Sequence, residues 1–313
     1  MRPDAFAAVM ATGIVSVAAA DHGMDVISAA LAIVAVVALP VLVIAAAVVW
    51  KRDSWKLGDL DTAIGLFTYV AACCVVAARF DSHPVVVWIL GGLALQGWLS
   101  LAPFVVRGMW RIRWTGLRDR ARGGWELASV ATSGLAIVCV AADVVFLALI
   151  FWTLALCAYC AMTALIGWRA THEPAVRRNV PPDHWILMGG LAIATLAGDH
   201  IHHALHSGPI ADAVRGVTIV TWVLASLWIL PLAAVGWRRI RDWPAVFPLG
   251  MYSSATFAMA AETGWTWLTV VSLAFFWLAF ALWLATSPSL AISARSVASA
   301  ATHRAQSRGG WWR

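Results

Sequence analysis

The basic residues of this chain lie almost entirely in every second gap between its apolar segments. Of the 22 lysines and arginines, 20 fall in alternate gaps, and only Arg79 and Arg215 fall in the others. Because basic loops beside membrane-spanning segments stay in the cytoplasm, the pattern predicts a multi-pass protein of the cell membrane with both termini cytoplasmic. The apolar runs, in chain order, are Ala5–Ala20, Val26–Trp50, Leu60–Ala78, Val85–Val106, Trp125–Ala142, Val144–Trp168, His184–Leu205, Ala213–Trp237, Trp243–Ala261 and Trp265–Thr286.

The composition supports this class of protein. Hydrophobic residues make up 62% of the 313 residues and charged residues only 12%, whereas soluble domains contain roughly 25% charged residues. Most runs reach the ~20 residues that cross a ~30 Å hydrocarbon layer. We expect an all-α transmembrane domain of ten helices over residues 1–286, embedded in the lipid bilayer, and a basic, disordered cytoplasmic tail over residues 287–313. The arginines are scattered over short loops, which argues against nucleic-acid binding.

Ten runs with both termini on one side form five consecutive hairpins, so all odd-numbered runs cross the membrane in the same direction. An Ala-Thr pair recurs inside four of the five odd runs. The pairs are Ala11–Thr12, Ala131–Thr132, Ala194–Thr195 and Ala255–Thr256. Small residues allow close helix contact, and the hydroxyl can bind a partner helix or a solute in a pathway. Alternatively, each threonine bonds only to a carbonyl of its own helix.

Ionisable residues lie in the loops or near the ends of the runs. Among the acidic ones are Glu126, Asp143, Asp199 and Glu262. A charge at the bilayer centre is costly and usually functional, so an uncharged middle argues against a proton-coupled carrier with a central carboxylate relay. The same neutrality suits the passage of an anion, which a fixed carboxylate would repel.

Four short motifs, all on odd-numbered runs, carry a resemblance to a known family. They are Met10–Ser16, Val130–Ile137, Met188–Gly198 and Phe247–Tyr252. On these motifs the chain resembles the tellurite-resistance/dicarboxylate transporter family from Pro3 to about Thr286. That family is similar to the plant slow anion channels and includes malic acid transport proteins.

The resemblance implies a fold and a function. Members of that family have ten helices, with the odd ones around a central pore and the even ones outside, and they often form trimers. Their substrates are small anions such as malate and other C4-dicarboxylates, chloride, nitrate or sulfite, and tellurite resistance is a bacterial phenotype. We therefore expect a homotrimer that conducts a small anion, is not an enzyme and needs no cofactor. The residues that we expect to line the pore are Thr12, Gly13, Ser16, Thr132, Ser133, Thr195, Gly250 and Thr256.

The resemblance also implies a gate. In the channel branch of the family, a phenylalanine on the ninth helix closes the pore, and the matching residue is Phe247. Pro248 follows it and cannot donate a backbone hydrogen bond, so the helix should kink there and free a carbonyl group. An aromatic ring beside such a kink can form a constriction that excludes water. The alternatives are that Phe247 packs against lipid or another helix, or that Phe257 is the gate.

The seventh run ends in a group of histidines beside an aspartate. Asp199, His202, His203 and His206 include pairs spaced three and four residues apart, which places them on neighbouring turns of a helix. This spacing can bring side chains together on a metal ion. A solvated helix end or a pH-sensitive lip at the outer surface explains the same residues.

Three functions from different classes are compatible with these features. An anion channel or facilitator would use the hydroxyls of the odd helices and a Phe247 gate. A proton-coupled dicarboxylate carrier would need a titratable group in the middle of the membrane. A membrane metalloenzyme would use the residues from Asp199 to His206. We favour the channel.

Overall fold

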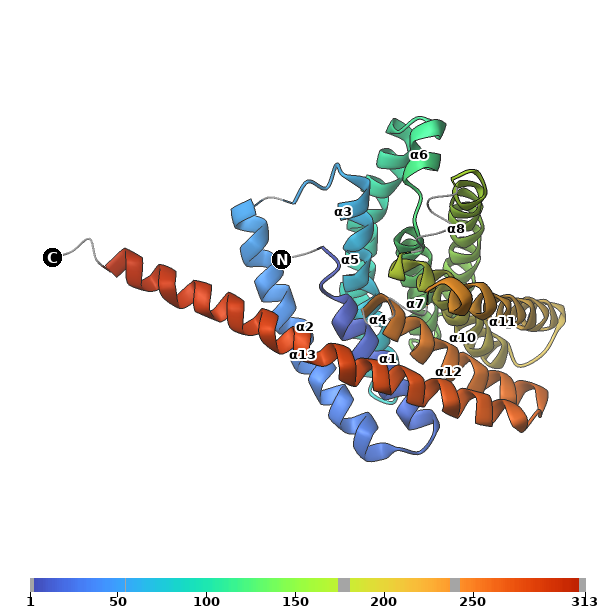
Figure 1. Ribbon diagram of the computed structural model, residues 1–313. Coiled ribbons are helices and arrows are strands. Elements are labelled where there is room, and N and C mark those ends of the chain that lie inside the picture. Colours follow the sequence, from blue (N-terminus) through green and yellow to red (C-terminus); the bar gives the residue numbers. More distant parts are fainter. Residues whose placement is uncertain (1–2, 54, 174–180, 237–242, 310–313) are drawn as a thin grey trace.

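The computed structural model describes residues 3–53, 55–173, 181–236 and 243–309 (Figure 1). Every regular element within these residues is a helix, which confirms the predicted all-α class. Seven helices in this part of the chain are long and apolar enough to cross a membrane by length and composition. Each predicted apolar run coincides with one of the main helices, or with a helix broken in two.

The odd-numbered runs form an inner layer of buried helices. These helices are α1 (Ala7–Asp21), α3 (Leu60–Gly65) continued by α4 (Phe67–Arg79), α7 (Leu127–Ala141) preceded by the 3-10 turn η1 (Gly123–Glu126), α10 (Trp185–Leu205) preceded by the 3-10 turn η2 (Pro182–His184), and α12 (Trp243–Thr263). Neighbours contact one another in the order α1, α4, α7, α10 and α12, and α12 returns to contact α1. The inner helices thus close into a ring.

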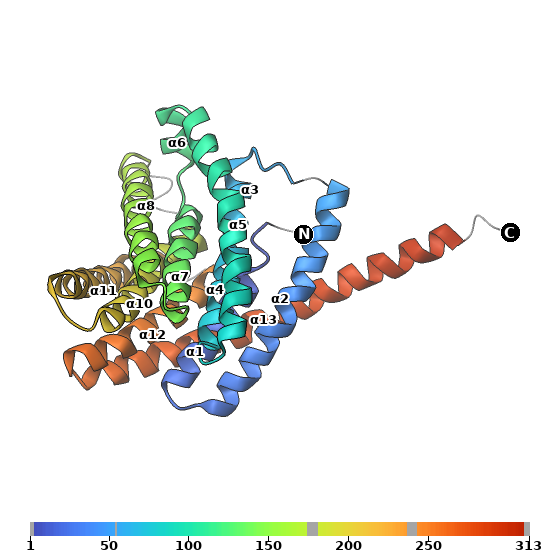
Figure 2. The same cartoon turned by 180° about the vertical axis from the view of Figure 1, so that it is seen from behind.

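The even-numbered runs form an outer layer. The helices are α2 (Asp25–Asp53), α5 (Pro84–Arg111), α8 (Val145–His172), α11 (Pro209–Gly236) and α13 (Trp267–Gly309). In the view from behind, α5 and α8 flank α7 (Figure 2). The outer helices expose large apolar side chains such as Ile33, Trp88 and Val270. Such surfaces are unfavourable in water and compatible with lipid.

The inner helices α1, α10 and α12 are absent from the seven apolar helices. Helix α1 has only 15 residues, while α10 and α12 carry aspartate, histidine, serine, glutamate or proline within their length. Because protein rather than lipid surrounds these helices, their polar groups need not face hydrocarbon. Mean hydropathy therefore identifies two inner segments, Leu60–Arg79 and Gly123–Ala141, as long apolar helices, but not the other three.

Glycines allow the inner helices to approach closely. A Cβ atom added to Gly13 of α1 would lie 2.8 Å from Val75 of α4, and one added to Gly134 of α7 would lie 2.9 Å from Cys74 of α4. At the other side of the ring, a Cβ at Gly250 of α12 would lie 3.1 Å from Ile14 of α1. Small residues at such contacts are typical of helix packing in membranes. Two predicted pore residues, Gly13 and Gly250, thus lie at contacts between helices.

The basic segment after residue 286 forms the last part of helix α13 (Trp267–Gly309). Helix α13 continues through Pro288 as far as Gly309 and projects away from the rest of the protein (Figure 1). The segment is rich in alanine and arginine, which have high helix propensity. A proline within the helix costs one backbone hydrogen bond, which the adjoining turns tolerate here.

Candidate functional site: two cavities in the ring of inner helices

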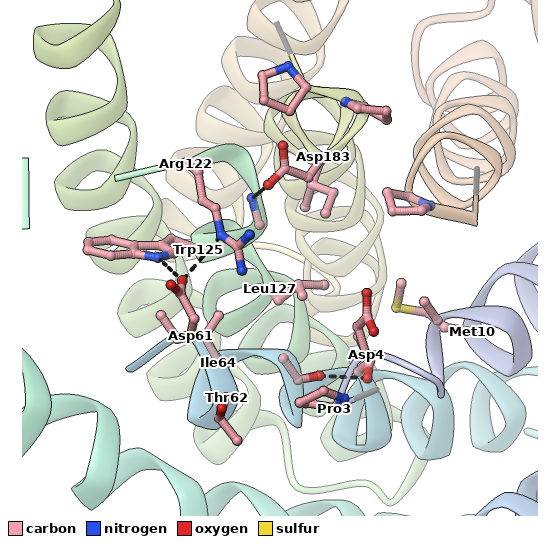
Figure 3. A pocket seen from close by; sticks show the side chains of 18 residues that line it. Pro3, Asp4, Met10, Asp61, Thr62, Ile64, Arg122, Trp125, Leu127 and Asp183 are labelled. Atoms are coloured by element: carbon pink, nitrogen blue, oxygen red, sulfur yellow. Dashed lines mark hydrogen bonds and ion pairs between the residues drawn. The ribbon is translucent and has the colours of Figure 1, made fainter. Parts of the chain in front are cut away.

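A cavity of about 470 Å³ lies where the inner helices begin, at the end of the protein that carries the basic loops. We call it the basic-end cavity (Figure 3). Every inner helix contributes residues from at or near its N-terminal end. The lining includes Ala7 of α1, Asp61 and Thr62 of α3, Gly124 and Trp125 of η1, Asp183 of η2, and Pro244 of α12. The N-termini of five inner segments therefore surround one cavity.

Hydrogen bonds and ion pairs hold the charged groups of this cavity in place. Asp61 accepts a hydrogen bond of 2.9 Å from the indole Nε1 of Trp125, and the Nε of Arg122 lies 3.2 Å from the same oxygen (Figure 3). Asp183 accepts a hydrogen bond of 3.0 Å from the backbone N–H of Gly124, which joins η2 to η1. These contacts tie three inner segments together at the mouth of the ring.

The carboxyl group of Asp183 has a lowered pKa. Burial by itself would raise this pKa, but the hydrogen bond and charge of His184, the N–H of Gly124 and the charge of Arg122 lower it below its usual range. Asp183 is thus a fixed negative charge at neutral pH. The cavity is also lined by Asp4, Asp61 and Arg122, so its lining is charged.

A second, much smaller cavity of about 20 Å³ lies inside the ring, further along the inner helices from their N-termini. We call it the apolar cavity. All the inner helices line it, and it has no charged residue. The lining residues are Ile14, Val17, Cys74, Val75, Ala78, Gly134, Ile137, Ile193, Leu196 and Met251. Its volume is close to that of a single water molecule, and its walls offer a water few hydrogen-bond partners. The centre of the ring is therefore narrow and apolar.

Phe247 lies between the two cavities along α12. Pro244 lines the basic-end cavity and Met251 lines the apolar cavity; these residues are three positions before and four positions after Phe247, so all three share one face of the helix. The side chain of Phe247 is completely buried. Helix α12 is continuous through Pro248, and Pro248 lies against α10, where a Cβ added to Gly189 would be 3.0 Å from its ring.

Three other inner helices carry small residues at the level of Phe247. On α4, Ala71 lies between Thr68 of the basic-end cavity and Val75 of the apolar cavity. By the same helical spacing, Ala131 occupies this level on α7 and Gly189 occupies it on α10. Three of the inner helices thus carry alanine or glycine where α12 carries a phenylalanine.

The threonines of the recurring Ala-Thr pairs face the outer layer. Thr12 accepts a hydrogen bond of 2.9 Å from the indole of Trp283 in α13, and Thr132 accepts one of 2.9 Å from the indole of Trp98 in α5. Each of these two hydroxyls also donates to a carbonyl four residues earlier in its own helix.

The other two pairs contact α11. The hydroxyl of Thr195 lies 2.9 Å from the hydroxyl of Thr221, and Thr256 accepts a hydrogen bond of 3.2 Å from the indole of Trp222. The repeated motif therefore links the inner layer to the outer layer at four places. None of the eight predicted pore residues lines either of the two cavities.

Ser16 and Ser133, the remaining predicted pore residues, are buried. The hydroxyl of Ser16 donates to the backbone carbonyl of Ser28 in α2 at 2.7 Å and accepts a bond of 3.2 Å from the Nε of Arg79. Arg79, one of the two basic residues outside the basic loops, is thus bound at the contact between α1, α2 and α4. Phe257, the second candidate for the gate, packs its ring against His22 with the ring centroids 5.3 Å apart.

The histidines at the end of α10 are only partly brought together. Asp199 and His203 lie close to Glu262 of α12, and one ligand atom from each lies within 4.8 Å of the others. His202 lies beside Glu262, with 3.6 Å between its Nε2 and Oε1 of Glu262. His206 ends the helix with a positive φ of 61° and bonds to the carbonyl of Ala204. Among these groups, Glu262 is the one that the spacing within the seventh run could not supply.

One acidic residue near the start of α7 is more buried than its place at a run end suggests. The carboxyl group of Glu126 has no exposed surface and accepts hydrogen bonds of 2.7 Å from the hydroxyls of both Ser129 and Thr163. Thr163 lies in α8, so this carboxyl group faces the outer layer. It does not line the basic-end cavity, although its neighbours Trp125 and Leu127 do.

The chain matches two known proteins and one protein family. The chain is 28% identical over 143 residues to the uncharacterized membrane proteins MT1776 and Rv1735c of two Mycobacterium tuberculosis strains, CDC 1551 and H37Rv. The match covers 41% of this chain and 72% of each relative. Residues 1–289 match the family described as "SLAC1: Voltage-dependent anion channel", which confirms the resemblance inferred from the motifs. The chain therefore belongs to the voltage-dependent anion channel family.

Proposed function

We propose that this protein lets small anions cross a membrane through the centre of the ring of inner helices, and that Phe247 closes this path. The observation that carries the proposal is the position of Phe247 on one face of α12, between Pro244 at the basic-end cavity and Met251 at the apolar cavity. Membership of an anion channel family supports the same function. In this proposal, all ten predicted runs cross the membrane, and the inner helices surround the pore.

The helix directions favour anions. Each helix carries roughly half a positive charge at its N-terminus, and the N-termini of the inner segments surround the basic-end cavity. Free backbone N–H groups at such ends are common anion-binding groups. Asp4, Asp61 and Asp183 oppose this effect, but Asp61 is offset by Arg122 and Asp183 by its own hydrogen-bond donors. An anion entering the cavity would meet these positive helix ends.

In this proposal the apolar cavity has two effects: it does not repel an anion, and it excludes water and so blocks hydrated ions. Its lining includes no carboxylate that would repel an anion. A narrow apolar constriction excludes water, and an ion that must lose its hydration shell cannot pass. Rotation of the Phe247 ring toward the alanines and glycines at its level would widen the path. The substrates that fit this proposal are chloride, nitrate, sulfite, tellurite and small C4-dicarboxylates such as malate.

Two further expectations belong to the proposal. The large apolar side chains exposed on the outer layer suit contact with lipid or with further copies of the chain, as in a homotrimer. Both termini would lie in the cytoplasm, because the basic loops lie at the end where the inner helices begin. A proton-coupled dicarboxylate carrier is the second candidate, favoured by the buried carboxyl group of Glu126. That group faces α8 rather than the basic-end cavity, so we prefer the channel.

The test is to replace Phe247 with alanine in the reconstituted full chain. We expect Phe247→Ala to increase the anion current by about tenfold or more, because the substitution opens the path between the two cavities. Phe257→Ala is the matched control, since Phe257 lies on the same helix and contacts His22; it should leave the current unchanged. Currents would be compared for chloride, nitrate, sulfite and malate in planar bilayers.

Two outcomes would count against the channel. Equal currents in the two alanine variants would remove Phe247 as the gate. Flux that requires a proton gradient, saturates at a low turnover and is abolished by Glu126→Gln would favour the carrier instead.

A further inference from the structure

The end of the protein opposite the basic loops carries a group of histidines and carboxylates from two inner helices. Asp199, His202 and His203 lie in the last two turns of α10, and Glu262 lies at the end of α12. Asp199, His203 and Glu262 each offer a ligand atom within 4.8 Å of the other two. The rings of His202 and His203 pack edge to face, with 5.5 Å between their centroids. We call these four residues the outer cluster.

The outer cluster contains a buried carboxylate oxygen without a hydrogen-bond donor. The Oδ1 atom of Asp199 is inaccessible to solvent and accepts no hydrogen bond. The Nδ1 atom of His203 lies 3.6 Å from it, which is longer than a hydrogen bond. The side chain of Asp199 is only 12% exposed, and that of Glu262 only 9%. Because an unsatisfied buried carboxylate oxygen is unfavourable, this atom is suited to a cation.

The hydrogen bonds of the two histidines leave the right nitrogen available for a metal ion. The Nδ1 atom of His202 lies 3.2 Å from the backbone carbonyl of Ala211, and that of His203 lies 2.9 Å from the backbone carbonyl of Asp199. A carbonyl can only accept, so Nδ1 carries the proton in both rings and Nε2 keeps its lone pair. Metal-binding histidines commonly donate their second N–H to a carbonyl in this way.

We propose that Asp199, His202, His203 and Glu262 form a binding site for a divalent transition-metal ion, for which Zn²⁺ is the best match. Zn²⁺ binds imidazole nitrogens and carboxylate oxygens at about 2.0–2.2 Å in a tetrahedron, which places the ligand atoms about 3.3–3.6 Å apart. The distance between Nε2 of His202 and Oε1 of Glu262 is 3.6 Å. His203 approaches Asp199 through Nδ1, so in this proposal its side chain, which is 63% exposed, would turn and give up its hydrogen bond to the carbonyl of Asp199 to bring Nε2 to the ion.

Arg215 completes the surroundings of the outer cluster. Its Nε donates a hydrogen bond to Oε1 of Glu262, so the carboxylate is held in position from α11. Carboxylates that bind metal ions are commonly hydrogen-bonded to such outer partners. A bound ion would join α10 to α12, which are adjacent in the inner ring, at the end opposite the basic-end cavity. The site is independent of which anion the protein conducts.

Zinc binding to the full-length protein in detergent, with any affinity tag removed, tests the proposal. We expect wild-type protein to bind one Zn²⁺ per chain in equilibrium dialysis with metal analysis. The variants Asp199→Asn and His203→Gln should each weaken binding by about tenfold or more, because each removes one ligand of the ion. His206→Gln is the matched control, since His206 lies near these residues but bonds to Ala204; it should bind like the wild type.

A second measurement separates a lost site from a lost fold. Zn²⁺ should raise the unfolding temperature of the wild type and of His206→Gln, and should leave that of His203→Gln unchanged. The exposed ring of His203 makes this variant the safest for folding, which size-exclusion chromatography would verify. Absence of stoichiometric zinc binding in the wild type would overturn the proposal, and so would equal weakening by His203→Gln and His206→Gln.

Discussion

The two faces of the inner helices differ in polarity. For an anion pore one would expect hydroxyls toward the centre, but the inner helices turn apolar side chains toward the centre and hydroxyls toward the outer layer. The face toward the ring centre carries Ile14, Val75, Ile193 and Met251 around the apolar cavity. The face toward the outer layer carries hydroxyls that accept hydrogen bonds from outer-layer side chains, three of them from tryptophan indoles. The polar side chains thus hold the two layers together, while apolar ones form the narrow centre.

This difference has a physical reason. A threonine buried between helices must find a hydrogen-bond partner, and an indole N–H from the next helix satisfies it without water. At the centre of a closed pore, a hydroxyl would instead hold water and weaken the barrier to ions. Anion preference can then come from backbone rather than side chains, through the helix N-termini around the basic-end cavity.

The sharpest test of the comparison uses two residues of α10 that lie on opposite faces. Ile193 lines the apolar cavity, whereas Thr195 bonds to Thr221 of α11. We expect Ile193→Ser to raise anion flux into liposomes several-fold, because a hydroxyl would let water enter the constriction. Ile193→Val keeps the wall apolar and should change little.

Thr195→Val supplies the contrast for this test. If Thr195 only joins α10 to α11, the variant should have unchanged flux and a slightly lower stability. A strong loss of flux in Thr195→Val, with Ile193→Ser inactive or unchanged, would return the hydroxyls to the pore wall and reverse the comparison.

Much of the fold follows from the sequence, because apolar runs and basic gaps report helix length and direction. The face that each inner helix turns toward the centre does not follow, since protein surrounds these helices on all sides. Helix α1 is a clear case: nearly its whole length is buried, from Ala7 to Ala19. Hydrophobic periodicity then carries no signal for which face of the helix points to the centre.

The candidate sites also differ in how far the sequence can predict them. Phe247 could be found through the family motif, and Asp199 with His203 through their spacing on one helix. The basic-end cavity could not be predicted, because its lining comes from the ends of five segments that are far apart in the chain. Glu262 joins the outer cluster for a comparable reason: it lies on α12, and only the packing of α10 against α12 brings it near.

A smaller effect is expected for Asp183, a charged residue of the basic-end cavity. The pKa of Asp183 is lowered, so its ionised form stabilises the folded protein. This contribution is fully present above the usual pKa of an aspartate, about 3.9, and disappears as the pH falls through the lowered pKa. At pH 7 we expect Asp183→Asn to lower the free energy of unfolding by about 1 kcal/mol. Denaturant unfolding of both proteins in micelles, from pH 7 down to pH 3, measures the difference.

The pH dependence distinguishes this explanation from a general loss of packing. The gap between wild type and Asp183→Asn should begin to narrow below about pH 3.9, because the carboxyl group then takes up a proton more readily in the unfolded chain than in the folded protein. A gap that stays constant over the whole pH range would mean that the charge of Asp183 does not stabilise the mouth of the cavity.

The smallest expected effect concerns the bonds between the layers. Trp98→Phe and Thr132→Val each remove one partner of the hydrogen bond between α5 and α7. A double-mutant cycle on the free energy of unfolding should give a coupling of about 0.6 kcal/mol, the average for side-chain hydrogen bonds between membrane helices. Anion flux should be the same in all four proteins, since neither side chain lines a described cavity. A coupling near zero together with altered ion selectivity in Thr132→Val would mean that this hydroxyl serves the anion and not the outer layer.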